Sequence, residues 1–200
     1  MTPSAKRWAS GLAIAAALAV SVQAGRKQFQ APIADPQGRL LIIEYSDYQC
    51  PHCKAAQPVV KELLSHYGDK VHWVHKNFPL DMVHTEARPA AIAAVCAQRQ
   101  GKFEAYNDLL FDRQDGWSTA KDPSPYFDEY AKETGLDVSK FDACRQDPTA
   151  DQSVKADQKD GMDLGVTSTP TFFIDNQRMV GGPQLQWKGP RLIDKWLAKK

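Results

Sequence analysis

The sequence predicts an α/β fold of two halves, a strand–helix–strand unit and a later strand–strand–helix unit, separated by an all-helical insertion. Residues 39–45 form an apolar, β-rich run, and a helical pattern and a second alternating run follow it. Residues 83–164 change to helical spacing broken by glycine and proline, and β character returns at 171–175. The 200 residues, 42% of them hydrophobic, suffice to bury one globular core.

The first half is predicted to cover residues 25–82. The run "RLLIIEY" (39–45) is a strand, the segment "PHCKAAQPVVKELLSHYG" is a helix that ends at Gly68, and "KVHWVHKNF" (70–78) is a second strand. A helical crossover between two strands of one sheet places them parallel. We therefore expect a parallel pair with the active-site candidate at its helix start.

The insertion (83–164) and the second half (165–200) complete the predicted fold. The insertion contains four or five helical segments separated by glycine, "DPSP" and Asp-Pro breaks. The second half reads as a strand "TFFID", an Asn176-Gln177 turn, a strand "RMVGG", and a final amphipathic helix broken near Gly189-Pro190. Trp187 and Trp196 of that helix are expected to pack against the sheet.

Residues 1–24 have the pattern of a cleavable secretory signal peptide. Two basic residues, Lys6 and Arg7, precede an apolar stretch at 11–20, and small or aliphatic residues follow at 22–24. The alternative is an uncleaved membrane anchor, but the stretch is shorter than the roughly 20 residues that span a bilayer. We expect a periplasmic or secreted protein.

The charge balance argues against nucleic-acid binding. Residues 1–24 hold two of the 25 basic residues and none of the 24 acidic ones, so the expected mature chain has a formal charge of about −1. A nucleic-acid binder would carry a concentrated basic face. Export also brings the four cysteines into an oxidising compartment, where they tend to pair.

The stretch "CPHC" places two cysteines at the start of the first helix. Pro51 suits the first helical position, which makes Cys50 the N-cap residue, at the positive end of the helix dipole. That position and a cationic His52 both favour a thiolate at Cys50. Cys53, one turn further and more enclosed, is the natural partner that closes or resolves the disulfide.

Two other uses of the pair stay open on the residues alone. A zinc clip needs two further ligands, and His72, His75 and His84 come without a second close cysteine pair, so we expect no bound metal or other cofactor. His66, His72 and His75 are expected at solvated or core-edge positions, whereas His84 opens the insertion beside "NFPL", where it either lies near the cysteine pair or packs at a helix start. A purely structural disulfide between Cys50 and Cys53 is the second alternative, although so short a loop gains little from closure.

The chain resembles the thioredoxin superfamily, and more closely the DsbA-type thiol-disulfide oxidoreductases with a short helical insertion. The resemblance rests on "CPHC" after a strand, on "NFPL" and "HTEARPAAIAAVCA", and on "GVTSTPTFFI" before the last strands. It implies a thioredoxin fold with a cis Pro170 that, with Thr169, faces the redox pair and binds substrate. It also implies that Glu44 exchanges a proton with Cys53; the alternative for Glu44 is an outward-facing strand residue.

Cys96 and Cys144 form the second cysteine question. Each lies on an apolar helix face, with Ile92 four residues before the first and Phe141 three before the second, so the faces can meet. In an exported protein we expect a structural disulfide, and closing that loop would stabilise the fold by roughly 4 kcal/mol. The alternative is two unconnected core cysteines.

The leading functional hypothesis is a disulfide oxidase. A stabilised Cys50 thiolate stabilises the reduced form and so makes the pair an oxidant. We expect reduced exported polypeptides as substrates, a quinone-linked membrane reoxidase resembling DsbB or vitamin K epoxide reductase as partner, and a monomer. Thr169 before Pro170 favours a reductase or isomerase, because relatives that reduce or isomerise disulfides carry a threonine at this position. A reductase or isomerase kept reduced by a membrane donor, and a non-catalytic metal-binding protein, remain as alternatives.

Overall fold

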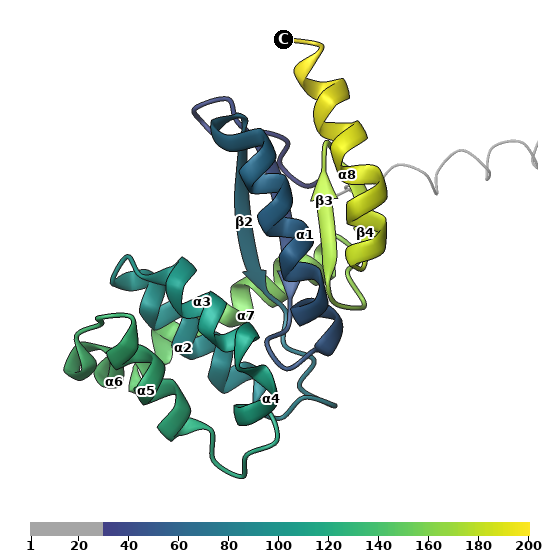
Figure 1. Cartoon of the computed structure of the whole chain (residues 1–200). Helices are drawn as coiled ribbons and strands as arrows, with labels where there is room; N and C mark the ends of the chain where they lie inside the picture. The colour runs from purple at the N-terminus through teal and green to yellow at the C-terminus, as the bar shows by residue number, and fades with distance from the viewer. Residues whose placement is uncertain (1–29) are drawn as a thin grey trace, which may run out of the picture.

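The structure of the chain is a computed structural model that describes residues 30–200 (Figure 1). It contains a four-stranded mixed sheet with the order β2-β1-β3-β4. The strands are β1 (Leu40–Ser46), β2 (Val71–Asn77), β3 (Thr171–Ile174) and β4 (Gln177–Val180). The predicted signal peptide lies outside the described residues. Within them, no helix combines the length and apolarity that a membrane crossing requires.

The sheet pairing confirms the predicted fold class. β1 and β2 are parallel and are connected by α1 (Pro51–Tyr67) and a short 3-10 turn, while β3 runs antiparallel to both β1 and β4. The hairpin between β3 and β4 turns at Asp175-Asn176 and not at the expected Asn176-Gln177. Both turn residues have positive φ, 48° and 59°, which aspartate and asparagine tolerate best, so Gln177 is free to begin β4.

β1 is buried on both faces, which explains its unbroken apolar run. Leu40 and Ile42 face a core formed with α1 and α8 (Gly182–Leu197), and the two helices lie side by side on that face (Figure 1). Leu41 and Ile43 face the opposite core. Because side chains alternate along a strand, Glu44 falls on the α1 side.

The insertion consists of six helices, one more than the upper expectation, because the four-residue α4 had no periodic signal of its own. They are α2 (Ala87–Arg99), α3 (Phe103–Asp112), α4 (Gln114–Trp117), α5 (Ser124–Glu133), α6 (Val138–Gln146) and α7 (Pro148–Asp163). Cys96 of α2 and Cys144 of α6 form a disulfide, with an S–S distance of 2.08 Å and a Cα–Cα distance of 5.7 Å. The helical block extends from one end of the sheet (Figure 1).

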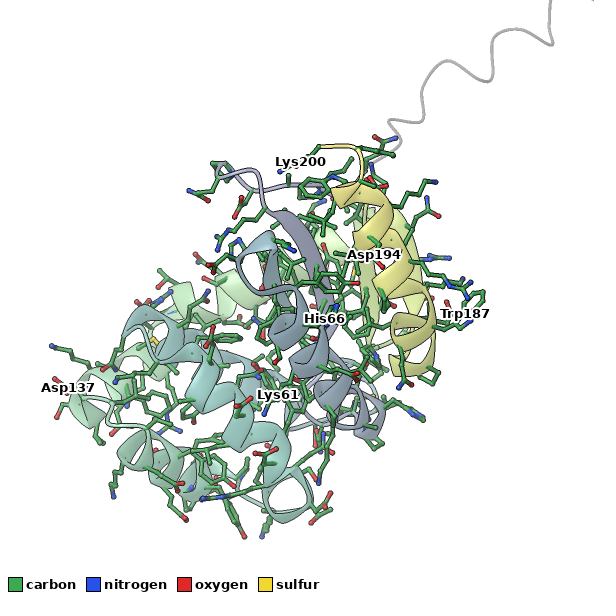
Figure 2. All side chains as sticks on the ribbon, turned by 45° about the horizontal axis from the view of Figure 1, so that its top comes forward. Lys61, His66, Asp137, Trp187, Asp194 and Lys200 are labelled. Atoms are coloured by element: carbon green, nitrogen blue, oxygen red, sulfur yellow. A yellow bond between two sulfur atoms is a disulfide. The ribbon has the colours of Figure 1, made fainter. Side chains whose placement is uncertain are left out.

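α8 differs from expectation in two respects. It continues through Pro190 without a break, because Gly189 lies buried against Leu63 of α1 and holds the helix on its neighbour. Trp187 is 60% exposed and points away from the molecule, where the Arg191 guanidinium lies 4.6 Å from the centre of its ring (Figure 2). The buried positions of α8 include Leu185, and a residue two further along faces the other side of a helix.

Candidate active site

Cys50 and Cys53 lie at the start of α1, where the sheet meets the helical insertion. Cys50 has extended backbone angles (φ −75°, ψ 121°) and is the N-cap residue, and Pro51 occupies the first helical position. Both cysteines are in the free thiol form. Cys50 is 5% exposed and Cys53 is 0% exposed, so Cys50 is the sulfur nearer to solvent.

The surroundings of Cys50 favour its thiolate. A hydrogen bond from the Cys53 thiol is the largest influence, and it lowers the pKa of Cys50 to about 5 although burial acts in the opposite direction. The Thr169 side chain and the backbone N–H groups of Cys53 and His52 add to this effect on the pKa. No first-turn N–H donates to the sulfur with full capping geometry. The helix start therefore helps to stabilise the Cys50 thiolate, but it is not the largest influence on the pKa of Cys50.

Cys53 has the opposite protonation preference. Burial and the neighbouring Cys50 sulfur raise its pKa well above that of an ordinary thiol. Its sulfur accepts a hydrogen bond from the backbone N–H of Asp47 at 3.4 Å. In the reduced pair, the negative charge resides on Cys50 and the proton on Cys53.

The Thr169-Pro170 loop faces Cys50. The Thr169-Pro170 peptide bond is cis, and the Thr169 carbonyl oxygen lies 3.6 Å from the Cys50 sulfur. The Pro170 carbonyl accepts the Gly181 N–H at 2.8 Å, which ties the loop to the start of α8. The loop that the family resemblance associated with the redox pair thus lies against it.

A cavity of about 480 Å³ opens beside the pair. His52 of α1 and the residues Thr169 and Pro170 form part of its lining, and the remainder is mostly small or apolar: Ala55, Ala56, Val59, Ser168, Val180, Gly181, Gly182, Pro183 and Gln186. His52 is exposed at this cavity. Its expected influence on the Cys50 thiolate stays a prediction.

Glu44 is fully buried beneath α1, so the outward-facing alternative does not hold. Desolvation raises the pKa of its carboxyl group to about 7, even though the side chains of Ser46, Trp73 and Gln57 oppose the shift. Trp73 Nε1 donates to one carboxylate oxygen at 3.0 Å and Gln57 Nε2 to the other at 3.2 Å. Gln57 also donates to the Cys53 carbonyl at 3.4 Å, so a single side chain connects Glu44 with the redox helix.

The histidines behave differently from one another. His72 pairs with Asp35 at 3.0 Å at a half-exposed position, as expected. His75 is half-buried, which agrees with the core-edge position expected of it. Desolvation lowers its pKa to about 3, and neither ring nitrogen has a hydrogen-bond partner within the described chain. The ring stacks on Tyr48 with centroids 5.1 Å apart. β2 directs His75 toward the helical insertion, and hydrophobic periodicity alone does not show that contact.

Gln57 and Asp47, both near the pair, were not singled out from the sequence, whereas His84 was expected near it. Gln57 lies one turn after Cys53, and its helical spacing could have shown that it reaches back toward the site. Asp47 and His84 pair at 2.8 Å between segments far apart in the chain. Among residues 30–200, no group of three or more His, Cys, Asp or Glu side chains is arranged to hold a metal ion.

Fold and site together define a redox domain with one acidic and one shielded thiol facing a cis-proline loop. Residues 31–195 match the family described as thioredoxin, and the chain belongs to this family. The thioredoxin-like fold with a helical insertion, which the resemblance to DsbA-type proteins implied, is also confirmed, and the chain carries a CXXC pair at Cys50 and Cys53.

Solved structures with the same fold include two oxidoreductases and the protein BdbD. A thioredoxin-like oxidoreductase from Silicibacter pomeroyi is 24% identical, with a TM-score of 0.68 over 85% of this chain and 91% of that one. DsbA from Xylella fastidiosa is 16% identical (TM-score 0.70, 84% and 92% covered). BdbD from Bacillus subtilis is 18% identical (TM-score 0.69, 83% and 91% covered). At these identities the likeness shows the fold.

The curated relatives are longer proteins. The Na(+)/H(+) antiporter NhaA 1 of Mycobacterium sp. (strain KMS) is 36% identical over 166 residues, which cover 80% of this chain and 25% of that protein. NhaA 3 of Salinispora tropica is 35% identical over 165 residues, covering 82% and 24%. The chain thus spans about a quarter of the curated relatives that it matches.

Proposed function

We propose that this protein is an exported thiol oxidase that introduces disulfides into reduced polypeptides through Cys50 and Cys53. The observation that carries the proposal is the opposite shift of the two thiols, with a Cys50 pKa of about 5 and a Cys53 pKa well above the ordinary value. A couple whose reduced form is stabilised in this way gives up its disulfide readily. Export rests on the signal-peptide pattern of residues 1–24.

The exchange proceeds in two displacements. A substrate thiolate attacks the Cys50 sulfur of the disulfide, the S–S bond breaks, and its electron pair leaves on the Cys53 sulfur, which takes up a proton. A second substrate thiolate then attacks the substrate sulfur of the mixed disulfide and releases Cys50 as a thiolate. Two substrate thiols become one disulfide, and the protein gains two electrons, which a quinone-linked membrane partner would remove.

Glu44 is the proposed proton partner of Cys53. A carboxyl group with a pKa of about 7 holds or releases a proton close to neutral pH, where the exchange operates. Its connection to the redox helix through Gln57 supports this role. Because Cys53 is buried, a protein group is better placed than bulk solvent to supply its proton.

The cavity beside the pair is the proposed substrate site. Its apolar lining suits the side chains of an unfolded polypeptide, and Thr169 and Pro170 stand at its edge next to Cys50. An extended segment could pass its backbone along this loop while its cysteine reaches the sulfur.

The direction of electron flow separates the oxidase from the alternative of a reductase or isomerase. Thr169 favoured that alternative by resemblance, whereas the lowered pKa of Cys50 supports an oxidising pair. The deciding measurement is the redox equilibrium of the purified protein with glutathione, followed by tryptophan fluorescence.

An oxidase requires a couple clearly more oxidising than glutathione, together with catalysed disulfide formation in a reduced model polypeptide. The variant Cys50→Ser is expected to abolish turnover, and Cys96→Ser/Cys144→Ser serves as the control that removes the other pair. A potential as reducing as that of thioredoxin would overturn the oxidase and favour a membrane-driven reductase. Uptake of copper by the reduced pair without any thiol exchange would favour the non-catalytic metal-binding alternative.

A further inference from the structure

We propose that Asp47 and His84 form a positioning pair that holds the hydrogen bond to the Cys53 sulfur. The inference deepens the proposed function, since it rests on exchange through Cys50 and Cys53, but it applies to either direction of electron flow. Neither residue touches the substrate, so both would act through the redox cysteines.

Asp47 lies in the connection between β1 and α1, and its carboxylate is fully buried. One carboxylate oxygen accepts the backbone N–H of Gln49 at 2.7 Å. The other accepts the backbone N–H of Leu80 at 2.8 Å and Nδ1 of His84 at 2.8 Å. A buried carboxylate with three donors is held firmly in one orientation, because losing any of them leaves charge uncompensated.

The backbone of Asp47 contacts both redox cysteines. Its N–H donates to the Cys53 sulfur at 3.4 Å, and its carbonyl accepts the Cys50 N–H at 3.1 Å. The same residue therefore has a fixed side chain and a backbone that touches both sulfur-bearing residues. Any movement of the Asp47 backbone changes the donor available to the Cys53 sulfur.

His84 brings a second segment of the chain to this point. It follows β2 and precedes α2, and its own N–H donates to the Leu80 carbonyl at 2.9 Å, so Leu80 and His84 reach Asp47 from one short loop. The adjoining Glu86 N–H donates to the Gln49 side chain at 2.8 Å. The loop that leads into the helical insertion is thus fastened to the loop that carries the redox pair.

The chemical consequence concerns Cys53 more than Cys50. Cys53 becomes a thiolate when it leaves during oxidation of a substrate, and it must attack as a thiolate in the reverse step. A buried thiolate needs a hydrogen-bond donor, and the Asp47 N–H is positioned to be one. A loosened Asp47 would slow the steps that form or consume the Cys53 thiolate and leave the first reaction of Cys50 unchanged.

The test follows the reaction of the reduced protein with 5,5′-dithiobis(2-nitrobenzoate). Cys50 attacks the reagent and releases one thionitrobenzoate anion, and Cys53 then attacks the mixed disulfide and releases a second. The two absorbance phases report the two cysteines separately. The variants are Asp47→Asn, which places an amide NH2 against at least one of the three donors, and the milder His84→Gln.

A matched control is available at the other end of β1. Asp35 is also a buried carboxylate that pairs with a histidine, His72 at 3.0 Å, and accepts a backbone N–H, that of Arg39 at 2.8 Å. The strand between Asp35 and Asp47 separates them by about 20 Å. Asp35→Asn therefore reproduces the loss of a buried carboxylate without approaching the redox pair.

We expect both site variants to slow the second phase roughly threefold to tenfold and to leave the first phase within about twofold of wild type. Asp35→Asn is expected to change neither phase. Normal second phases in both site variants, or equal slowing of both phases, would overturn the positioning pair. If Asp47→Asn does not fold, His84→Gln decides alone. A wild-type protein that shows no second release would instead overturn the proposed function itself.

Discussion

At the scale of single residues, the fold buries the Glu44 carboxyl group although desolvation disfavours its charged form. The carboxyl group lies among α1, β1 and β2 and accepts hydrogen bonds from Gln57 and Trp73. The sequence left its direction undecided, because neighbouring residues on both sides of it are apolar. The structure decides the question, since β1 is covered on both faces and no outward-facing side exists there.

The raised pKa of Glu44 predicts a pH dependence of stability. The pKa rises from 4.5 to about 7 on folding, so the folded protein holds the proton more tightly than the unfolded chain. The stabilisation is complete below pH 4.5 and disappears as the pH rises through about 7. At 1.36 kcal/mol per pKa unit, the free energy of unfolding falls by about 3 kcal/mol across this window.

Glu44→Gln should remove this part of the pH dependence. Urea unfolding of the oxidised protein at several pH values measures it without interference from the Cys50 and Cys53 thiols, which do not titrate as a disulfide. The control is Glu62→Gln, on the exposed side of α1. An unchanged pH profile in the Glu44 variant would assign the effect to another group.

Local sequence signals and long-range contacts differ in how much of the site they reveal. The positions of Cys50, Pro51 and Cys53 at a helix start could be predicted from neighbouring residues, because a proline after an N-cap marks a helix start. Asp47 and His84 are 37 residues apart, and their pairing depends on how the loop after β2 returns to the end of β1. No periodicity encodes that return, so the sequence alone did not identify the pair.

At the scale of secondary-structure elements, α7 approaches the sheet closely because of a glycine. A Cβ atom at Gly161 would come within 2.8 Å of Tyr45 Cδ1 and 2.7 Å of Phe78 Cδ2. These two aromatic rings belong to the core on that face of the sheet. The helix can therefore lie directly on the rings only where the side chain is absent.

Gly161→Ala should destabilise the fold. Alanine gains about 1 kcal/mol in helix propensity, but overpacking against fixed aromatic rings costs about 1–3 kcal/mol, so a net loss of up to about 2 kcal/mol is expected. The control is Gly116→Ala in α4, whose Cβ would lie an ordinary 3.7 Å from Tyr126. Thermal unfolding compares them, and an equal midpoint for both variants would contradict the close-packing argument.

Element types were predicted better than their ends. The strands and α1 agree with the sequence pattern within one or two residues, because their apolar periodicity is strong. The break expected at Pro190 was wrong, since packing of Gly189 and Ile193 on the sheet side outweighs the local cost of a proline. Propensity describes a segment by itself, whereas this helix is determined by its neighbours.

At the scale of the whole molecule, the helical insertion forms part of the redox site. Cys50 and Cys53 share a buried cluster with side chains of the insertion such as Tyr106 and Trp117. Gln114 of α4 donates to the Cys50 carbonyl at 3.0 Å and to the Tyr48 carbonyl at 2.7 Å. The α/β fold class and the insertion were predictable from the order of patterns, but this shared core was not.

Removal of the Cys96–Cys144 disulfide should therefore affect the entire molecule. Its 48-residue separation corresponds to a stabilisation of roughly 4 kcal/mol in the loop-entropy description. Cys96→Ser/Cys144→Ser should lower the unfolding midpoint in a single transition, seen equally by far-ultraviolet dichroism and by tryptophan fluorescence. Loss of the insertion's signal ahead of the sheet's would show that the two parts unfold separately.

The unequal burial of the two sulfurs provides a way to identify the client proteins in a cell. Cys53 is 0% exposed, so every client thiol that arrives can be joined only to Cys50. In a Cys53→Ala protein, the Cys50 thiolate would attack a disulfide of a client polypeptide, release one client thiolate and stay bonded to the other client sulfur, because the Cys53 sulfur that would resolve this mixed disulfide is missing. Mass spectrometry of the retained mixed disulfides would then identify the client proteins and the cysteine of each that reacts.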